Sequence, residues 1–301
     1  MLEYLMMVLP HLLATAVREK RLAFRRRVLR WGRANLRPYP WREAGRTPYD
    51  ILVAELLLKR TTATAAARAY SNFLSRYPTI ECLASVPTKE LEQHLQPVGL
   101  YVQRAKAITG LAEHLMQREG GSIPSSLSRL GKGPGLGDYA ARAVLSFGFG
   151  VPVAAVDANV ARVIGRVFQK ALRDRPAPSV IQGVADELLP RAAHREFNFG
   201  LLDLGAVVCR YGRPRCDECP LTLICDYYCS GEAPKRGQPG EALRKARLAK
   251  RMALVELAKR AGVSKLTIVN IEAGRTRPRP ETIARLISVL GDGEVGILEE
   301  A

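Results

Sequence analysis

Apolar residues recur at helical spacing along most of the chain. Two early stretches, 20–35 and 49–75, have apolar residues three and four positions apart, which predicts amphipathic helices. Pro38, Pro40 and Pro48 lie between them and predict a turn region. Strand-like alternation is scarce, so the main body is expected to be all-α. Further helices are expected at about 88–96, 102–118, 139–147, 157–171, 178–190 and 198–208.

Composition divides the chain near its C-terminal end. Residues 230–240 are polar and rich in glycine and proline, which is typical of a linker. We therefore expect a large unit over 1–229 and a small helical unit over 241–295. A length of 301 residues gives room for two or three domains, and an apolar content of 47% excludes wholesale disorder.

The net charge is strongly positive, because 46 lysines and arginines face 29 acidic residues. A chain with a formal charge of +17 usually meets an anionic partner, and nucleic acid is the first candidate. A generally basic surface is the alternative. The excess is concentrated in residues 18–46, which hold 11 basic and 2 acidic residues.

The first 17 residues are apolar, but Pro10 interrupts them and no basic residue precedes them. Neither the positive start nor the cleavage site of a signal peptide is clear. No apolar stretch is long enough to cross a membrane. We expect a cytoplasmic, nucleoid-associated protein without a membrane partner.

Five of the six cysteines crowd into residues 209–229. A secreted disulfide scaffold would spread its cysteines along the whole chain, so this cluster points to a metal or iron–sulfur site. Zinc sites prefer two close pairs separated by a longer loop, whereas this spacing has one close pair between wider gaps. It favours a [4Fe–4S] cluster over zinc and leaves Cys229 as a surplus thiol. The expected ligands are Cys209, Cys216, Cys219 and Cys225.

A glycine-rich segment, Leu-Gly-Lys-Gly-Pro-Gly-Leu-Gly-Asp, occupies residues 130–138. It predicts a tight turn after one helix and a new helix that begins near Asp138. Glycines such as Gly135 and Gly137 let the backbone approach a partner, and free N–H groups at a helix start can hold a phosphate. A plain turn is the alternative.

An acidic residue, Asp157, follows 18 residues after Tyr139 in the apolar segment Val-Asp-Ala-Asn-Val-Ala-Arg-Val. An unpaired carboxylate is costly in such surroundings. The structural interpretation is the N-cap of a helix over 158–170, and the functional one is a catalytic carboxylate at a helix start. The two are compatible.

Together these motifs resemble the helix-hairpin-helix DNA glycosylases of the endonuclease III and MutY type. The resemblance rests on Pro-Gly-Leu-Gly-Asp-Tyr-Ala-Ala, on the segment around Asp157 and on the cysteine spacing, and it covers roughly 25–228. It implies two α-helical lobes with DNA across their cleft: a barrel lobe at about 42–152 and a cluster lobe formed by 18–41 with 153–229. The hairpin amides would hold a phosphate, and the target nucleotide would be flipped into a pocket between the lobes.

The same resemblance implies that Asp157 stabilises positive charge on the sugar and positions water, the one small-molecule cosubstrate. Members that also cut the strand carry a Schiff-base lysine where this chain has Tyr139, so we expect a monofunctional enzyme that leaves an abasic site. Glu55 matches the glutamate that protonates departing adenine, but the thymine enzymes are similar there too.

Two features favour thymine, and uracil, mispaired with guanine as the target. Leu-Lys-Arg-Thr-Thr at 58–62 is close to the Leu-Arg-Arg-Thr-Thr of mismatch thymine glycosylases, and nothing resembles the lesion-sensing C-terminal domain of MutY. Lys59 or Arg60 would fill the gap or contact guanine. Leu100 and Tyr101 are candidates for a second wedge, with plain core as the alternative. An adenine glycosylase acting on A:G or A:8-oxoguanine stays open.

Residues 241–290 resemble the helix-turn-helix of phage-repressor-like regulators. Residues 264–272 would enter the major groove of double-stranded DNA, with Ser264, Lys265 and Thr267 facing bases or phosphates. Ala-Leu-Val at 253–255 stands where that family has Ser-Gln-Glu, so a protein-interaction module is the alternative. A DNA-binding regulator that reuses an inactive glycosylase body is a third hypothesis for the whole chain.

Overall fold

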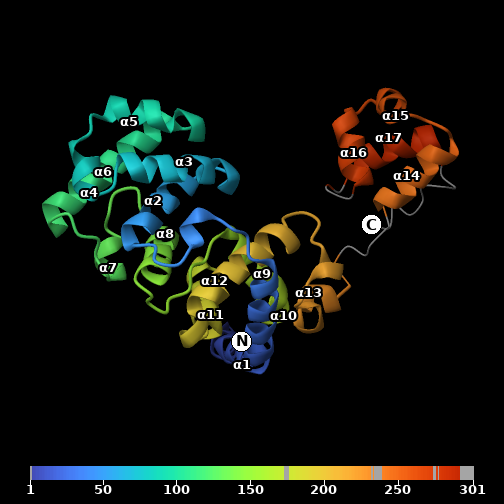
Figure 1. Cartoon of the computed structure of the whole chain (residues 1–301). Coiled ribbons are helices and arrows are strands. Elements are labelled where there is room, and N and C mark those ends of the chain that lie inside the picture. Colours follow the sequence, from blue (N-terminus) through green and yellow to red (C-terminus); the bar gives the residue numbers. More distant parts are fainter. Residues whose placement is uncertain are drawn as a thin grey trace.

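Every regular element in the described part of the chain is a helix, as the hydrophobic pattern predicts, and the all-α fold class is confirmed. The structure is a computed structural model that describes residues 2–172, 176–231, 233, 239–273, 276 and 278–291 (Figure 1). Its α-helices are α1 (Leu2–Asn35), α2 (Pro48–Leu58), α3 (Ala63–Arg76), α4 (Ile80–Ser85), α5 (Thr88–Leu95), α6 (Tyr101–Glu119), α7 (Leu127–Leu130), α8 (Asp138–Ala143), α9 (Ala158–Val167), α10 (Gln169–Leu172), α11 (Pro178–Leu188), α12 (His194–Asp203), α13 (Asp226–Cys229), α14 (Pro239–Ala249), α15 (Leu254–Ala261), α16 (Lys265–Glu272) and α17 (Pro280–Leu290).

The large unit has two groups of helices around one continuous hydrophobic core. Helices α2 to α8 form one group, in which α6 packs against α4 and α5. Helix α1 returns the start of the chain to the second group, where it packs against α11 and α12 (Figure 1). Helices α8 and α12 each continue as one π-helical turn, Val144–Gly148 and Leu204–Val208.

Helix α1 and helix α12 cross closely because both have a glycine at the crossing point. A Cβ atom on Gly32 would lie 3.0 Å from the Cα atom of Gly200, which leaves no room for a side chain. Such an approach brings the backbones together and fixes the N-terminal helix on the second lobe. α1 also extends further than the expected 20–35.

Much of the positive charge in residues 18–46 is used inside the protein. The Lys20 ammonium lies 2.6 Å from the Asp226 carboxylate. The Arg25 guanidinium donates hydrogen bonds of 2.8 to 3.0 Å to three carbonyl groups at the C-terminal end of α11. These groups need donors because no further helical turn supplies them. The basic stretch therefore holds α1 in place as well as adding surface charge.

The single helix expected over 49–75 is wrong, because it is two helices separated by a loop. Arg60 in this loop has a left-handed backbone, with φ of 56°. Thr62 then caps α3, since its hydroxyl oxygen accepts a hydrogen bond from the Ala65 N–H at 3.3 Å. This cap lies inside an otherwise unbroken apolar pattern, so periodicity alone does not reveal the break.

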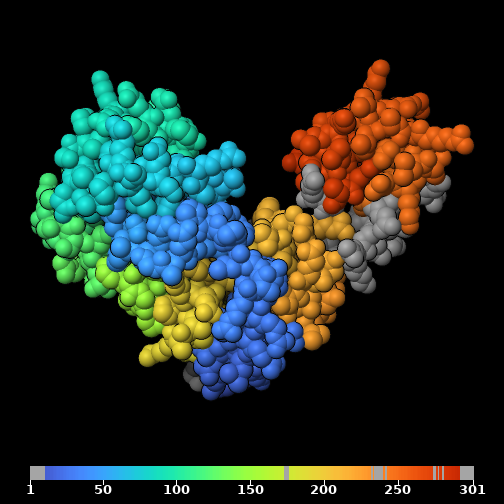
Figure 2. Space-filling model, in the orientation of Figure 1, coloured from blue at the N-terminus to red at the C-terminus, as the bar shows by residue number. Residues whose placement is uncertain are grey.

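The C-terminal helices α14 to α17 enclose a second, separate core. Figure 2 shows them as a body of their own. Arg247 forms a buried ion pair with Glu272, with N–O distances of 2.6 and 2.9 Å, and ties α14 to the end of α16. Among the described residues, no helix is long and apolar enough to span a membrane.

Candidate active site

A cavity of about 470 Å³ lies where the two lobes meet, and it brings the three predicted catalytic residues together. Glu55 comes from α2, Tyr139 from α8, and Asp157 from the start of α9. The volume is in the range of pockets that take small molecules. Residues more than 80 positions apart in the chain thus share one concave site.

Asp157 is both a helix cap and a wall of this cavity. Its Oδ1 accepts a hydrogen bond from the Val160 N–H at 2.8 Å, and its Oδ2 accepts one from Asn159 Nδ2 at 2.7 Å. The positive end of the α9 dipole also stabilises the negative charge of the carboxylate. The structural and functional interpretations therefore describe the same geometry.

Asn159 is itself held by Arg162, whose Nη2 donates to Asn159 Oδ1 at 2.7 Å. The same guanidinium donates from Nε to the Cys209 carbonyl at 2.7 Å and from Nη2 to the Gly205 carbonyl at 2.7 Å. One side chain thus connects the Asp157 partner with the first clustered cysteine. The sequence motif offers no reason to single out either Asn159 or Arg162, although both lie within five residues of Asp157.

Glu55 and Tyr139 line the same cavity as Asp157. Burial and, to a lesser degree, the neighbouring Asp157 side chain raise the pKa of Glu55 to about 8, while Arg42 partly opposes the shift. Burial also raises the pKa of Tyr139 well above its usual value, with Glu55 and Asp157 adding to the effect. At neutral pH the site therefore holds two groups, Glu55 and Tyr139, that keep their protons.

The raised pKa of Glu55 predicts a dependence of stability on pH. The usual glutamate pKa is 4.5, so the folded protein binds this proton more tightly, and that stabilisation is lost as pH rises through about 8. We expect Glu55→Gln to gain about 3 kcal/mol in unfolding free energy relative to wild type between pH 5 and pH 9. Urea unfolding of both proteins at pH 5, 7 and 9 measures this. A difference that does not change with pH would contradict the burial of a protonated Glu55.

A buried cluster of charges supports the opposite wall. Asp203 is fully buried and accepts hydrogen bonds from Arg42 at 2.6 and 2.9 Å and from Arg37 Nε at 2.7 Å. Burial alone would raise the pKa of Asp203, but the bonds and charges of Arg42 and Arg37 hold it below its usual value. Two arginines on one carboxylate leave net positive charge beside the cavity. The apolar pattern does not predict this pairing, because its members are about 160 residues apart.

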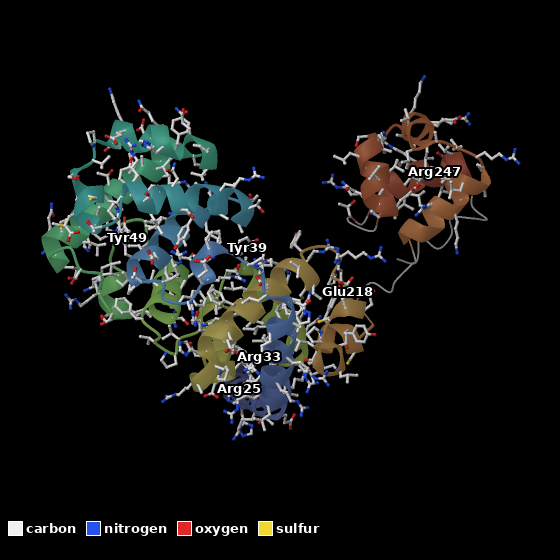
Figure 3. The ribbon with its side chains drawn as sticks, viewed as in Figure 1. Arg25, Arg33, Tyr39, Tyr49, Glu218 and Arg247 are labelled. Atoms are coloured by element: carbon white, nitrogen blue, oxygen red, sulfur yellow. The ribbon has the colours of Figure 1, made fainter. Side chains whose placement is uncertain are left out.

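Aromatic rings line the same wall. Phe147 and Phe199 are stacked with ring centroids 4.0 Å apart, and the Arg42 guanidinium lies 4.6 Å from the Phe199 centroid. Tyr39, which Figure 3 labels, lies in the segment between α1 and α2. It stacks on Trp41 with ring centroids 4.8 Å apart. Flat apolar rings of this kind suit a planar base.

Three of the predicted DNA-contacting residues, Lys59, Gly135 and Gly137, line the cavity. Lys59 Nζ lies 3.2 Å from the Gly135 carbonyl and joins the loop after α2 to the hairpin. Gly135 has φ of +76°, which suits glycine, and Gly137 is the N-cap of α8. The Asp138 carboxylate pairs with Arg142 at 2.8 Å. Arg60 is exposed.

Leu100 and Tyr101 are surface residues, with 45% and 40% of their area exposed. The alternative that they are plain core is wrong. Leu100 also has φ of 50°, a left-handed conformation that places it at the tip of the turn before α6. Two exposed turns, one with Arg60 and one with Leu100, are therefore available to contact a duplex.

The four predicted cluster ligands line one small cavity together with Arg166. Arg166 Nη1 lies 3.3 Å from the Cys209 thiol, and burial with nearby thiols raises the pKa of Cys216 to about 11. Among the described residues, no group of three or more His, Cys, Asp or Glu side chains is close enough to hold a single metal ion. Cys229 is exposed and does not line this cavity. Cys209, Cys216, Cys219 and Cys225 therefore share one cavity, and among the described residues they do not form a site for a single ion.

In the C-terminal unit, Ser264 is the N-cap of α16, and its oxygen accepts a hydrogen bond from the Thr267 N–H at 3.0 Å. Lys265 is exposed. Leu266, next to Lys265 in α16, exposes 65% of its area, and Val255 in α15 exposes 58%. The helix that is expected to meet DNA thus carries an exposed apolar group as well.

Comparison with known proteins agrees with this geometry. The model of the HhH-GPD superfamily base excision DNA repair protein matches residues 53–190, and a helix-turn-helix model matches 243–294. A thymine-DNA glycosylase of Aeropyrum pernix is 40% identical over 211 residues, which cover 68% of this chain and 94% of the relative. A thymine/uracil-DNA glycosylase of Methanothermobacter thermautotrophicus is 34% identical, with 71% and 96% covered.

An adenine DNA glycosylase of Mycobacterium tuberculosis is 35% identical over 215 residues and is covered over 70% of its length, as is this chain. The solved structure of a thermostable thymine-DNA glycosylase has 33% identity and a TM-score of 0.68, covering 71% of this chain and 99% of that structure. The chain therefore belongs to the HhH-GPD superfamily of base excision DNA repair proteins, as a DNA glycosylase with an added helix-turn-helix domain.

Proposed function

We propose that the enzyme hydrolyses the N-glycosidic bond of thymine, and of uracil, mispaired with guanine in double-stranded DNA and leaves an abasic site. The observation that carries this proposal is the cavity in which Asp157, Tyr139 and Glu55 meet beside stacked aromatic rings. Relatives named for thymine match over nearly their whole length, which supports the choice of base. Such mismatches arise in chromosomal DNA, so the enzyme would act in the cytoplasm at the nucleoid.

The proposed reaction separates charge between sugar and base. The Asp157 carboxylate stabilises the positive charge that develops on the sugar as the bond breaks, and it orients the attacking water. Asn159 holds the carboxylate in this orientation. Tyr139 and Glu55, both protonated, line the side of the pocket that receives the base and can donate hydrogen bonds to it.

DNA would lie across the junction of the two lobes. We assign the barrel lobe to residues 42–152 and the cluster lobe to residues 18–41 together with 153–229. The amides at Gly135, Gly137 and Asp138 would hold a phosphate. Lys59 and Arg60, with Leu100 and Tyr101, would enter the duplex and replace the extruded nucleotide. A mispaired base is cheaper to extrude than a paired one, which supplies part of the selectivity. The helix-turn-helix domain (241–295, after a 230–240 linker) would add contacts through Ser264, Lys265 and Thr267.

Adenine opposite guanine or 8-oxoguanine is the second candidate, and one observation favours it. A buried glutamate with pKa of about 8 is suited to protonate a departing purine. The matched adenine DNA glycosylase has about the same identity as one of the thymine relatives. Two observations rank this candidate second. This chain covers 94% and 96% of two thymine relatives but only 70% of the adenine relative, and its Leu-Lys-Arg-Thr-Thr loop is close to that of the thymine enzymes.

A strand-nicking assay on labelled duplexes containing T:G, U:G, A:G or A:8-oxoguanine separates the two candidates. We expect the T and U strands to be cut only after hot alkali. Cleavage of the A strand instead would assign the enzyme to the adenine class. Duplex binding without cleavage on any substrate would support the regulator hypothesis.

We further propose that Cys209, Cys216, Cys219 and Cys225 hold a [4Fe–4S] cluster. When bound, this cluster stabilises the fold of the loop that carries Arg210, Arg213 and Arg215. The buried thiols and the arginine beside Cys209 support this assignment, because a positive side chain compensates the charge of thiolate ligands.

Removal of one ligand tests the cluster. Cys219→Ala is expected to lose most of its iron, its acid-labile sulfide and its visible absorption, and to lose DNA binding with them. Cys229→Ala is the matched control, since that thiol is exposed and lies outside the cysteine cavity, and it should retain wild-type iron. Zinc in place of iron in the purified wild-type protein would contradict the assignment.

A further inference from the structure

Arg104, in the first turns of α6, is a buried cation that forms no salt bridge with a described residue. Only 6% of the residue is exposed. Burial lowers the pKa of its guanidinium, which shows that the surroundings supply little compensating charge. A buried charge is tolerated only when its hydrogen-bonding capacity is satisfied. The partners of Arg104 therefore identify what this costly residue is for.

The hydrogen-bond acceptors around the Arg104 side chain lie in three places: the end of helix α2, the 59–61 turn that follows it, and the 98–100 turn. Its Nη1 donates to the Leu56 and Leu57 carbonyls at the C-terminal end of α2. Its Nη2 donates to the Lys59 carbonyl at 2.9 Å and to Thr61 Oγ1 at 2.7 Å. The planar guanidinium can serve these acceptors at once, which a lysine cannot.

The second turn is bound to the first through the same group. Arg104 Nε points at the Gly99 carbonyl at 3.4 Å. The Thr61 hydroxyl donates to the Val98 carbonyl at 3.0 Å. One arginine and one threonine thus join the 59–61 turn to the 98–100 turn, although these segments are about 40 residues apart in the chain.

Each of the two turns has one residue with a left-handed backbone at its exposed tip. These residues are Arg60, with φ of 56°, and Leu100, with φ of 50°. Residues other than glycine keep this conformation only when their surroundings enforce it. Arg104 and Thr61 supply the hydrogen bonds that do so on the inner side of both turns.

We propose that Arg104 is a positioning residue that fixes the 59–61 and 98–100 turns as one rigid, two-point wedge, and so keeps the duplex open while the target nucleotide is extruded. The inference rests on the proposed function. Arg104 does not line the catalytic cavity, so it acts through Arg60 and Leu100. A wedge fixed in advance does not have to be ordered when DNA binds, which lowers the cost of extrusion.

Single-turnover rates on two substrates separate this role from simple stabilisation of α2. One substrate has uracil opposite guanine in a duplex, and the other has the same uracil inside a short unpaired bubble, where extrusion costs little. We expect Arg104→Met to slow the paired substrate about 100-fold and the bubble substrate less than about fivefold. 2-Aminopurine placed beside the target in the paired duplex becomes more fluorescent when the target nucleotide is extruded. Binding of Arg104→Met should give a smaller fluorescence increase than binding of the wild type.

Arg25→Met is the matched control, because Arg25 also caps the end of a helix through three carbonyl groups but lies on α1 against α11. It should lower stability without changing the ratio of the paired-substrate rate to the bubble-substrate rate. Arg104→Lys should recover part of the rate on the paired substrate. If Arg104→Met does not fold, Thr61→Val, which keeps the side-chain shape, should lower the same paired-to-bubble ratio.

Equal slowing of both substrates by Arg104→Met, or a selective loss in Arg25→Met, would overturn the positioning role. A paired-to-bubble rate ratio that Thr61→Val leaves unchanged would also overturn it. A wild-type protein without activity on either substrate would overturn the proposed function instead, so the two failures are distinguishable.

Discussion

Replacing Asp157 with asparagine is expected to lower the single-turnover rate of base release by about 10³-fold or more. Asparagine has nearly the same shape but no negative charge to stabilise the sugar. Its Oδ1 still accepts the Val160 N–H, so helix α9 remains capped. Its amide would face Asn159 Nδ2, so we expect the unfolding free energy to fall by about 1–2 kcal/mol.

Binding separates the loss of chemistry from the loss of structure. The Asp157→Asn variant should bind a G:T duplex at least as tightly as wild type in a fluorescence anisotropy titration, because the change removes a negative charge near the DNA backbone. A rate within tenfold of wild type would contradict the assignment of Asp157. Weaker binding together with a large loss of stability would show that Asp157 is mainly structural.

Replacing Tyr139 with lysine is expected to add a strand-cutting activity that we do not expect in the wild type. The side chain at position 139 lines the same cavity as Asp157. A lysine there would therefore lie close to the sugar of the target nucleotide. An uncharged lysine amine there can attack C1′ of the sugar and displace the base, after which the sugar ring opens to a Schiff base. Elimination of the 3′ phosphate from this Schiff base cuts the strand without alkali. Burial favours the uncharged amine, whereas Asp157 opposes it, so activity should increase with pH.

Borohydride trapping measures the new activity. Tyr139→Lys should give a covalent protein–DNA product and alkali-independent nicks, and both should grow between pH 7 and pH 9. Tyr139→Phe is the control for the loss of the hydroxyl and should give neither. Trapping of the wild type would contradict the monofunctional assignment, and the same result would place the Schiff-base nucleophile at another lysine.

Sequence alone predicts the parts of the site whose residues lie close together in the chain and form short motifs. The hairpin before α8, the capping position of Asp157 and the clustered cysteines all depend on neighbouring residues, so a local pattern is enough to find them. The same holds for the turn-helix pair of the C-terminal unit. For Leu100 the local pattern leaves wedge and core open, and only the fold shows that the side chain is exposed.

The supporting residues escape prediction because their partners are distant in the chain. Asp203 is satisfied by Arg37 and Arg42, and Arg104 by the loop after α2, across separations of about 40 to 166 residues. No periodicity connects such positions. Arginine in an apolar helix gives only a general indication that a buried acceptor must exist somewhere. The break between α2 and α3 escapes prediction for another reason: the Thr62 cap lies inside an apolar pattern that continues on both sides of it.

The most direct test is base release from a G:T duplex by the wild type and by Asp157→Asn, followed by mass spectrometry of the products before any alkali. We expect the wild type to give free thymine and an intact strand that carries an abasic site, and Asp157→Asn to give almost none of either product in the same time. A strand that is cut before alkali, thymine release by Asp157→Asn at nearly the wild-type rate, or release of adenine from an A:G duplex in place of thymine would contradict hydrolysis of the thymine bond through Asp157.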